Sequence, residues 1–171
     1  MPAVPPPVRF WLPAGWHEAP AEALRVPGMR VVALHEPADE GFTANITLSA
    51  QTVTEPDAVA AMADAAVERL RATERDVTVR RRGVVGHEQT PGLAQEVRLT
   101  TTVGGKAVEL AQLQAFLPAA DLADPGQQVV YTVTFTATVP QSVELGGDFQ
   151  AFVRSVRPAP APEAAPEPSD E

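Results

Sequence analysis

The residue types that carry most protein chemistry are few and scattered in this chain. It contains no cysteine, which excludes disulfides, thiolate metal sites and cysteine nucleophiles. Its three histidines, His17, His35 and His87, lie in separate segments without the close spacing of metal ligands. The chain also lacks the glycine-rich motifs that hold phosphates and the G-x-S-x-G motif of nucleophilic serines. We therefore predict a protein that is not an enzyme, with no catalytic residue, no metal and no cofactor.

The run Arg80-Arg81-Arg82 is the one concentrated basic feature. Side chains alternate between the two faces of a strand, so Arg80 and Arg82 are expected on one face and Arg81 on the other. The run either contacts an acidic partner or protects an edge strand against aggregation. We favour the edge strand.

The two tryptophans, Trp11 and Trp16, flank a turn at 13–15. Aromatic side chains dominate the binding energy of many protein interfaces, so both are candidate binding residues. The alternative, which we favour, is packing. In that case one of Phe10 and Trp11 points inward and the other outward, and Trp16 closes one end of the core.

The charge of the chain argues against nucleic-acid binding. The formal net charge is −9, and the last fourteen residues hold four acidic side chains and no basic one. Such a field repels phosphate backbones. No apolar run approaches the roughly 20 residues of a membrane-spanning helix, and the first residues show no secretory signal. We expect a cytoplasmic protein without a membrane span, or a cell-envelope protein if a leader has been removed.

Hydrophobic periodicity predicts the elements that position these residues. A helix is expected over 54–72, with Thr54 as its cap, and a second helix after Gly146-Gly147 that ends before Pro158. Gly104-Gly105 between two extended runs predicts a tight hairpin. Strands are expected at 8–12, 29–36, 43–50, 76–83, 94–103, 106–117 and 129–139.

This order of elements predicts the fold class and the domain boundaries. Runs of sequential strands with a hairpin favour an antiparallel sheet, which the two amphipathic helices must cover. We expect an α+β fold with a central antiparallel sheet of six to seven strands. A proline-rich lead-in at 1–7 precedes a single domain at 8–157, and an acidic, disordered Pro/Ala-rich tail follows at 158–171.

Several of these segments together resemble the PsbP-like superfamily, which includes the Mog-type, LpqN-type and secretion-chaperone families. The resemblance lies in the opening Phe10-x-Leu12-Pro13-x-Gly15-Trp16, the strand FTANITL and the closing Phe149-x-x-Phe152-Val153-x-Ser155. It implies an αβα sandwich and a non-catalytic binding or adaptor protein. We therefore expect a protein partner, contacted through the sheet or the opening turn, and leave a homodimer open.

Two other functions follow from different features. A secretion chaperone would hold apolar helices on a sheet face, to which Val108, Leu110 and Phe116 would contribute. The outer face of 129–139 is a row of threonines instead, which argues against this alternative. A small enzyme would need a cavity between sheet and helices lined by convergent polar groups.

Overall fold

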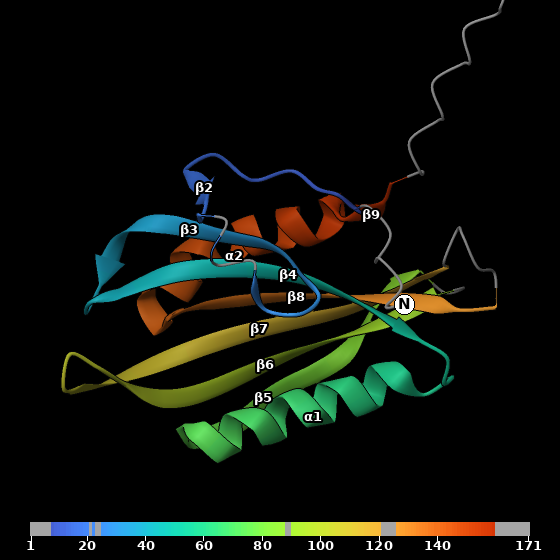
Figure 1. Cartoon of the computed structure of the whole chain (residues 1–171). Coiled ribbons are helices and arrows are strands. Elements are labelled where there is room, and N and C mark those ends of the chain that lie inside the picture. Colours follow the sequence, from blue (N-terminus) through green and yellow to red (C-terminus); the bar gives the residue numbers. More distant parts are fainter. Residues whose placement is uncertain (1–7, 21, 23–24, 88–89, 121–125, 160–171) are drawn as a thin grey trace, which may run out of the picture.

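A seven-stranded, wholly antiparallel sheet forms the body of the protein (Figure 1). The computed structural model describes residues 8–20, 22, 25–87, 90–120 and 126–159. The expected α+β class and strand number are confirmed. In sheet order the strands are β2 (Trp16–Glu18), β3 (Met29–Asp39), β4 (Phe42–Val53), β8 (Gln128–Thr138), β7 (Lys106–Ala120), β6 (Thr90–Val103) and β5 (Arg75–His87).

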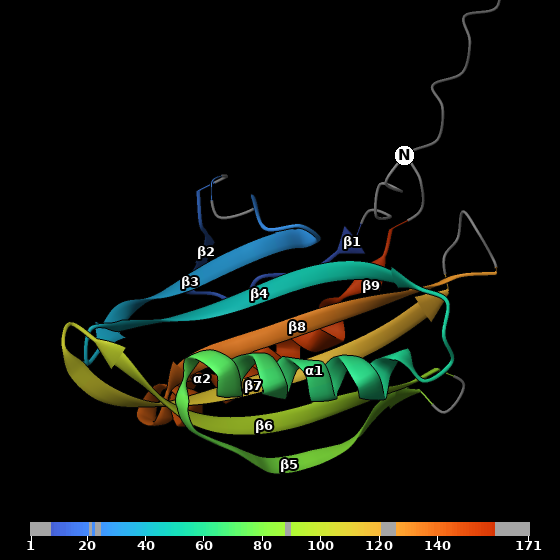
Figure 2. The ribbon, with the colours of Figure 1, turned by 60° about the horizontal axis from the view of Figure 1, so that its bottom comes forward.

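One helix lies on each face of this sheet. Helix α1 (Ala58–Thr73) packs on β5, β6 and β7, and helix α2 (Val139–Ser155) packs on β7 and β8 of the other face. Figure 2 shows α1 in front of the sheet and α2 behind it. Each helix therefore covers only part of its face. None of the helices in the described part of the chain is long and apolar enough to cross a membrane.

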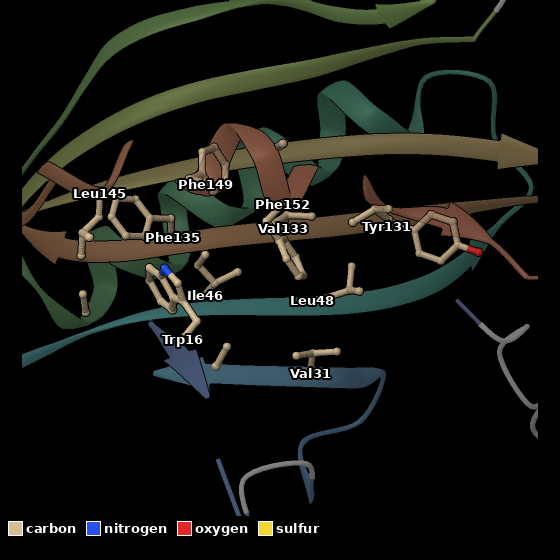
Figure 3. Close-up of a cluster of buried hydrophobic side chains, with 14 of the residues drawn as sticks. Trp16, Val31, Ile46, Leu48, Tyr131, Val133, Phe135, Leu145, Phe149 and Phe152 are labelled. Carbon is tan, nitrogen blue, oxygen red and sulfur yellow. The ribbon is translucent and has the colours of Figure 1, made fainter. Parts of the chain in front are cut away.

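The larger core lies between the sheet and α2. Strand β8 alternates as expected, so that Val133 and Phe135 are fully buried while Thr132 and Thr134 face the α1 side. Phe135 lies against Trp16 at a ring-centroid distance of 6.1 Å and against Phe149 of α2 at 5.8 Å. Figure 3 shows how side chains from β3, β4, β8 and α2 meet in this layer. Burial of such side chains contributes about 1.5–3 kcal/mol each.

Helix α1 packs on the sheet mainly through small side chains. Ala63, Ala66 and Val67 are buried, and Met62 packs against the sheet beside them. The hairpin between β6 and β7 is confirmed too, because Val103 pairs with Lys106, and Gly104 and Gly105 have φ of 55° and 82°. Positive φ at both positions is the geometry that favours a glycine pair.

Helix α2 begins earlier than expected. Gly146 and Gly147 lie inside the helix rather than before it. Thr138 starts α2 with a capping box: its hydroxyl accepts from the backbone N–H of Gln141, whose side chain accepts from the backbone N–H of Thr138. Pro140 stands in the first turn, where its missing N–H costs no helical hydrogen bond. These signals outweigh the low helix propensity of two glycines.

The other boundaries differ in smaller ways. The N-cap position of α1 is Asp57, whose side chain makes no capping hydrogen bond, and not Thr54, which directly follows the end of β4. The first expected strand is only β1 (Val8–Arg9), which pairs with β9 (Arg157–Pro158) in a separate two-stranded sheet. Pro158, expected in the tail, is therefore paired with Val8. The lead-in at 1–7 and the tail beyond Ala159 lie outside the described residues.

Candidate binding surfaces

Two hollows lie where the helices leave the sheet uncovered. On one face, α1 leaves the β4–β8 side open and forms the wall of the α1 groove, with a volume of about 830 Å³. On the other face, α2 leaves the β5–β6 side open and forms the wall of the α2 cavity, with a volume of about 1080 Å³. Both volumes are large enough to hold a small ligand.

The floor of the α1 groove is polar and uncharged. It is formed by Ser49 of β4, by Gln112 and Gln114 of β7, and by Thr132 and Thr134 of β8. The threonine face expected from the sequence thus points into this groove. An apolar helix placed on this floor would displace water from the hydroxyl groups of Ser49, Thr132 and Thr134, which is unfavourable.

A chain of hydrogen bonds runs beneath α1 from the edge of the sheet into this groove. Gln95, which is buried, donates to the carbonyl oxygen of Ala63 in α1 at 3.0 Å and to Gln114 Oε1 at 2.6 Å. Gln114 donates in turn to Gln112, and Gln112 Nε2 donates to Thr136 Oγ1 at 3.0 Å. The chain joins α1 to three strands.

The arginine run lies on β5, an edge strand of the sheet, as expected. Arg82 Nε donates to Gln95 Oε1 at 2.9 Å, and its Nη1 contacts Asp64 Oδ1 of α1 at 2.7 Å. Arg81 lies near Glu96 on the opposite face, at 3.7 Å. A register shift between Val79 and Arg81 interrupts the alternation on which the expected shared face of Arg80 and Arg82 depends. Arg82 therefore fastens α1 to the edge strand, a role that the sequence did not reveal.

The two tryptophans have opposite environments. Trp16 is 7% exposed and its Nε1 donates to Asp148 Oδ2 at 2.9 Å, so it closes one end of the core, as expected. Trp11 is 80% exposed, although the N–H of its backbone donates to Ser155 Oγ at 2.9 Å. Its neighbour Phe10 points inward and packs against Phe152, with ring centroids 5.7 Å apart. The expected division of Phe10 and Trp11 between inside and outside is confirmed.

Val108, Leu110 and Phe116 lie in the packed layer between the sheet and α1. Their exposures are 2%, 3% and 1%. Phe116 packs with Ala63 and Ala66 of α1, whereas Val108 and Leu110 form a separate cluster. Their apolar surface is used by the core and is not presented to a partner.

The histidines are not brought together. His17 is exposed, and His35 packs beside Trp16 at a ring-centroid distance of 5.2 Å. The side chain of His87 lies outside the described residues. Within the described ranges, no group of three or more histidine, aspartate and glutamate side chains is placed to hold a metal ion.

The architecture of the sheet and its helices matches that of several solved structures, while the sequence itself matches no family model and no curated protein. LpqN, involved in cell envelope biogenesis of Mycobacterium tuberculosis, is similar with a TM-score of 0.61 at 16% identity, over 94% of this chain and 87% of that chain. This chain has the PsbP/Mog-like fold.

Two further structures represent the families after which this fold is named. The cyanobacterial PsbP from Synechocystis sp. has a TM-score of 0.56 at 12% identity, over 89% of this chain and 86% of that chain. The Ran-binding protein Mog1p of Saccharomyces cerevisiae has a TM-score of 0.52 at 16% identity, over 88% of this chain and 89% of that chain. At these identities, the PsbP/Mog-like likeness establishes the arrangement of sheet and helices and not a shared activity.

Proposed function

We propose that this PsbP/Mog-like domain is a non-catalytic binding protein that engages a protein partner through Trp11. The observation that carries the proposal is a tryptophan that is 80% exposed on a well-held backbone. Tryptophan is among the residues most enriched in the energetic centres of protein interfaces. A protein-binding role also agrees with the name of one structural neighbour, the Ran-binding protein Mog1p.

The backbone around Trp11 is fixed from both sides. Ser155, near the end of α2, accepts from the Trp11 backbone N–H, and β1 pairs with β9 immediately before this segment. Phe10 is packed against Phe152 on one side of Trp11, and Leu12 packs against the core on the other. A backbone that is held in place before binding loses less conformational entropy when its side chain enters a partner's pocket.

The test is a comparison of interaction partners between matched variants. Trp11→Ala removes the exposed indole, and Val143→Ala removes a side chain that is 82% exposed on α2, as a control. We expect proteins cross-linked by the wild type and by Val143→Ala to be lost with Trp11→Ala, at unchanged thermal stability. Purified candidates should then bind Trp11→Ala at least about 30-fold more weakly. Equal recovery by all three proteins would contradict the proposal.

A further inference from the structure

The α2 cavity combines an apolar floor with a concentration of arginines. Leu113, Leu117 and Val153 line it and are only partly buried, although each packs against the main core. The lining includes the side chains of Arg81, Arg154 and Arg157 and one acidic side chain, Glu96. Arg82 also borders the cavity, but its guanidinium group contacts Asp64 of α1 on the other face of the sheet. Basic side chains therefore outnumber acidic ones at the cavity, although acidic side chains predominate in the whole chain, which has 13 basic and 22 acidic ones.

The depth of the cavity follows from the pairing of three strands. Gly83 of β5 pairs with Ala94 of β6, and Ala94 pairs with Ala115 of β7, which packs in the α2 layer. Larger side chains at these positions would fill the space between sheet and helix. Of the strands that form this floor, β7 is the one on which α2 packs most closely.

The arginines that line the cavity differ in their partners. Arg81 lies 3.7 Å from Glu96, whose other oxygen lies 3.8 Å from Arg98. Arg154 and Arg157, near the end of α2, form no ion pair with a carboxylate of the described residues. An incoming anion would therefore meet these two guanidinium groups without displacing an acidic side chain. Their two charges exceed the partial negative charge at the carboxyl end of a helix.

From this combination we propose that the α2 cavity binds a fatty acid. The acyl chain lies over the floor between β6 and α2, against Leu113, Leu117 and Val153, and the carboxylate contacts Arg154 and Arg157. Burial of the chain supplies a non-directional apolar contribution, and the guanidinium groups supply charge-assisted hydrogen bonds that select the head group. This site is separate from Trp11, which is not among its lining residues.

Three ligands with the same ten-carbon chain test the head group. Decanoate, decanol and decyltrimethylammonium are titrated below their micelle concentrations into the full chain, and the methyl NMR signals of Leu113, Leu117 and Val153 are followed. We expect decanoate to shift these signals and to bind about tenfold more tightly than decanol, with the cationic ligand weakest. Absence of decanoate binding, or equal affinity for all three ligands, would overturn the proposal.

Variants then test the location. The double variant Arg154→Gln with Arg157→Gln should bind decanoate about tenfold more weakly, while its affinity for decanol is unchanged. Arg80→Gln, an exposed arginine outside the cavity, is the control and should bind normally. Unchanged decanoate affinity in the double variant would place the carboxylate elsewhere and refute the assignment.

A cavity-filling change tests the acyl site independently. Ala94→Phe should abolish binding of both decanoate and decanol, whereas Ala107→Phe, on an exposed part of β7, should not. Thermal unfolding establishes whether each variant is folded. If Ala94→Phe does not fold, the arginine variants alone decide whether the cavity binds decanoate. If sedimentation instead shows a dimer that Ala94→Phe dissociates and decanoate does not, the occupant is a second copy of the chain and the proposal fails.

Discussion

Individual positions in this fold are decided by close approaches that the residue type alone does not disclose. Gly92 of β6 is buried, and a Cβ atom added to it would lie 2.5 Å from the carbonyl oxygen of Phe116. That atom belongs to the backbone of β7, so it cannot move aside without disturbing the sheet. Gly83, on the neighbouring strand, has nothing within 4 Å of such a Cβ.

This contrast predicts different effects of the same substitution. Gly92→Ala should lower the free energy of unfolding by about 1–3 kcal/mol, because the methyl group forces the backbone apart. Gly83→Ala should leave it unchanged or raise it by up to about 1 kcal/mol, since alanine restricts the unfolded chain. Urea denaturation of the two variants beside the wild type measures both. A loss of the same size in each would show that the approach of Gly92 to Phe116 is not the cause.

The two tryptophans illustrate what could be predicted at this scale. A strand over 8–12 predicted that Phe10 and Trp11 point in opposite directions. They do so in the structure, although β1 ends at Arg9. Which of them is inside depends on the position of Phe152, far along the chain, so the sequence left it open. The link between Arg82, Gln95 and Asp64 could not be found either, because spacing carries no information about residues on three separate elements.

At the level of whole elements, the hydrophobic period of the sequence predicted the long strands reliably. The strands around 43–50 and 129–139 keep a period of two along their length, and both are present as β4 and β8. Strand β2 has only three residues, too few to show a hydrophobic period in the sequence. It forms because it pairs with β3. The start of α2 was misplaced because a glycine pair weakens a helix without preventing one that is capped and buried.

The two helix starts predict unequal effects of removing their capping residues. Thr138→Ala should destabilise the protein by about 1–2 kcal/mol, because the hydroxyl accepts from Gln141 and donates to Asp39 Oδ2 at 2.6 Å. Asp57→Ala should change stability by less than about 0.5 kcal/mol, since the Asp57 side chain makes no capping hydrogen bond. Thermal unfolding monitored by circular dichroism compares them. Equal losses would mean that the capping box of α2 contributes little.

Across the molecule, the two helical layers are unequal. The cluster on the α2 side contains large aromatic side chains from the sheet and the helix. The α1 side is held by two smaller clusters, one of alanines with Phe116 and Val130 and one of Leu99, Val108 and Leu110. Polar links therefore matter more for α1, above all the hydrogen bond from Gln95 to Ala63. Hydrogen bonds in a buried network are costly to leave incomplete.

This asymmetry predicts that α1 unfolds locally more easily than the central strand β8. Amide hydrogens of α1, such as those of Ala66 and Val67, should exchange at a lower opening free energy than those of Val133 and Phe135 in β8. Gln95→Leu should lower the opening free energy of α1 by about 1–3 kcal/mol, because the hydrogen bond to the Ala63 carbonyl is lost and Arg82 Nε and Gln114 Oε1 each lose a hydrogen-bond partner. Native-state hydrogen exchange resolves the two elements. Equal protection of α1 and β8 in the wild type would show one cooperative unit instead.

The central place of β8, between β4 and β7, has a consequence for biosynthesis. On the ribosome, the hairpin of β3 and β4 and the meander of β5, β6 and β7 emerge first, each with an inner edge that has no strand beside it. Unpaired edges of this kind are prone to incorrect association. Both inner edges gain their neighbouring strand when residues 128–138 are synthesised, because β8 pairs with β4 and with β7. Truncation ahead of this segment would leave two incomplete half-sheets, so a nascent chain of this protein should need protection until β8 has left the ribosome.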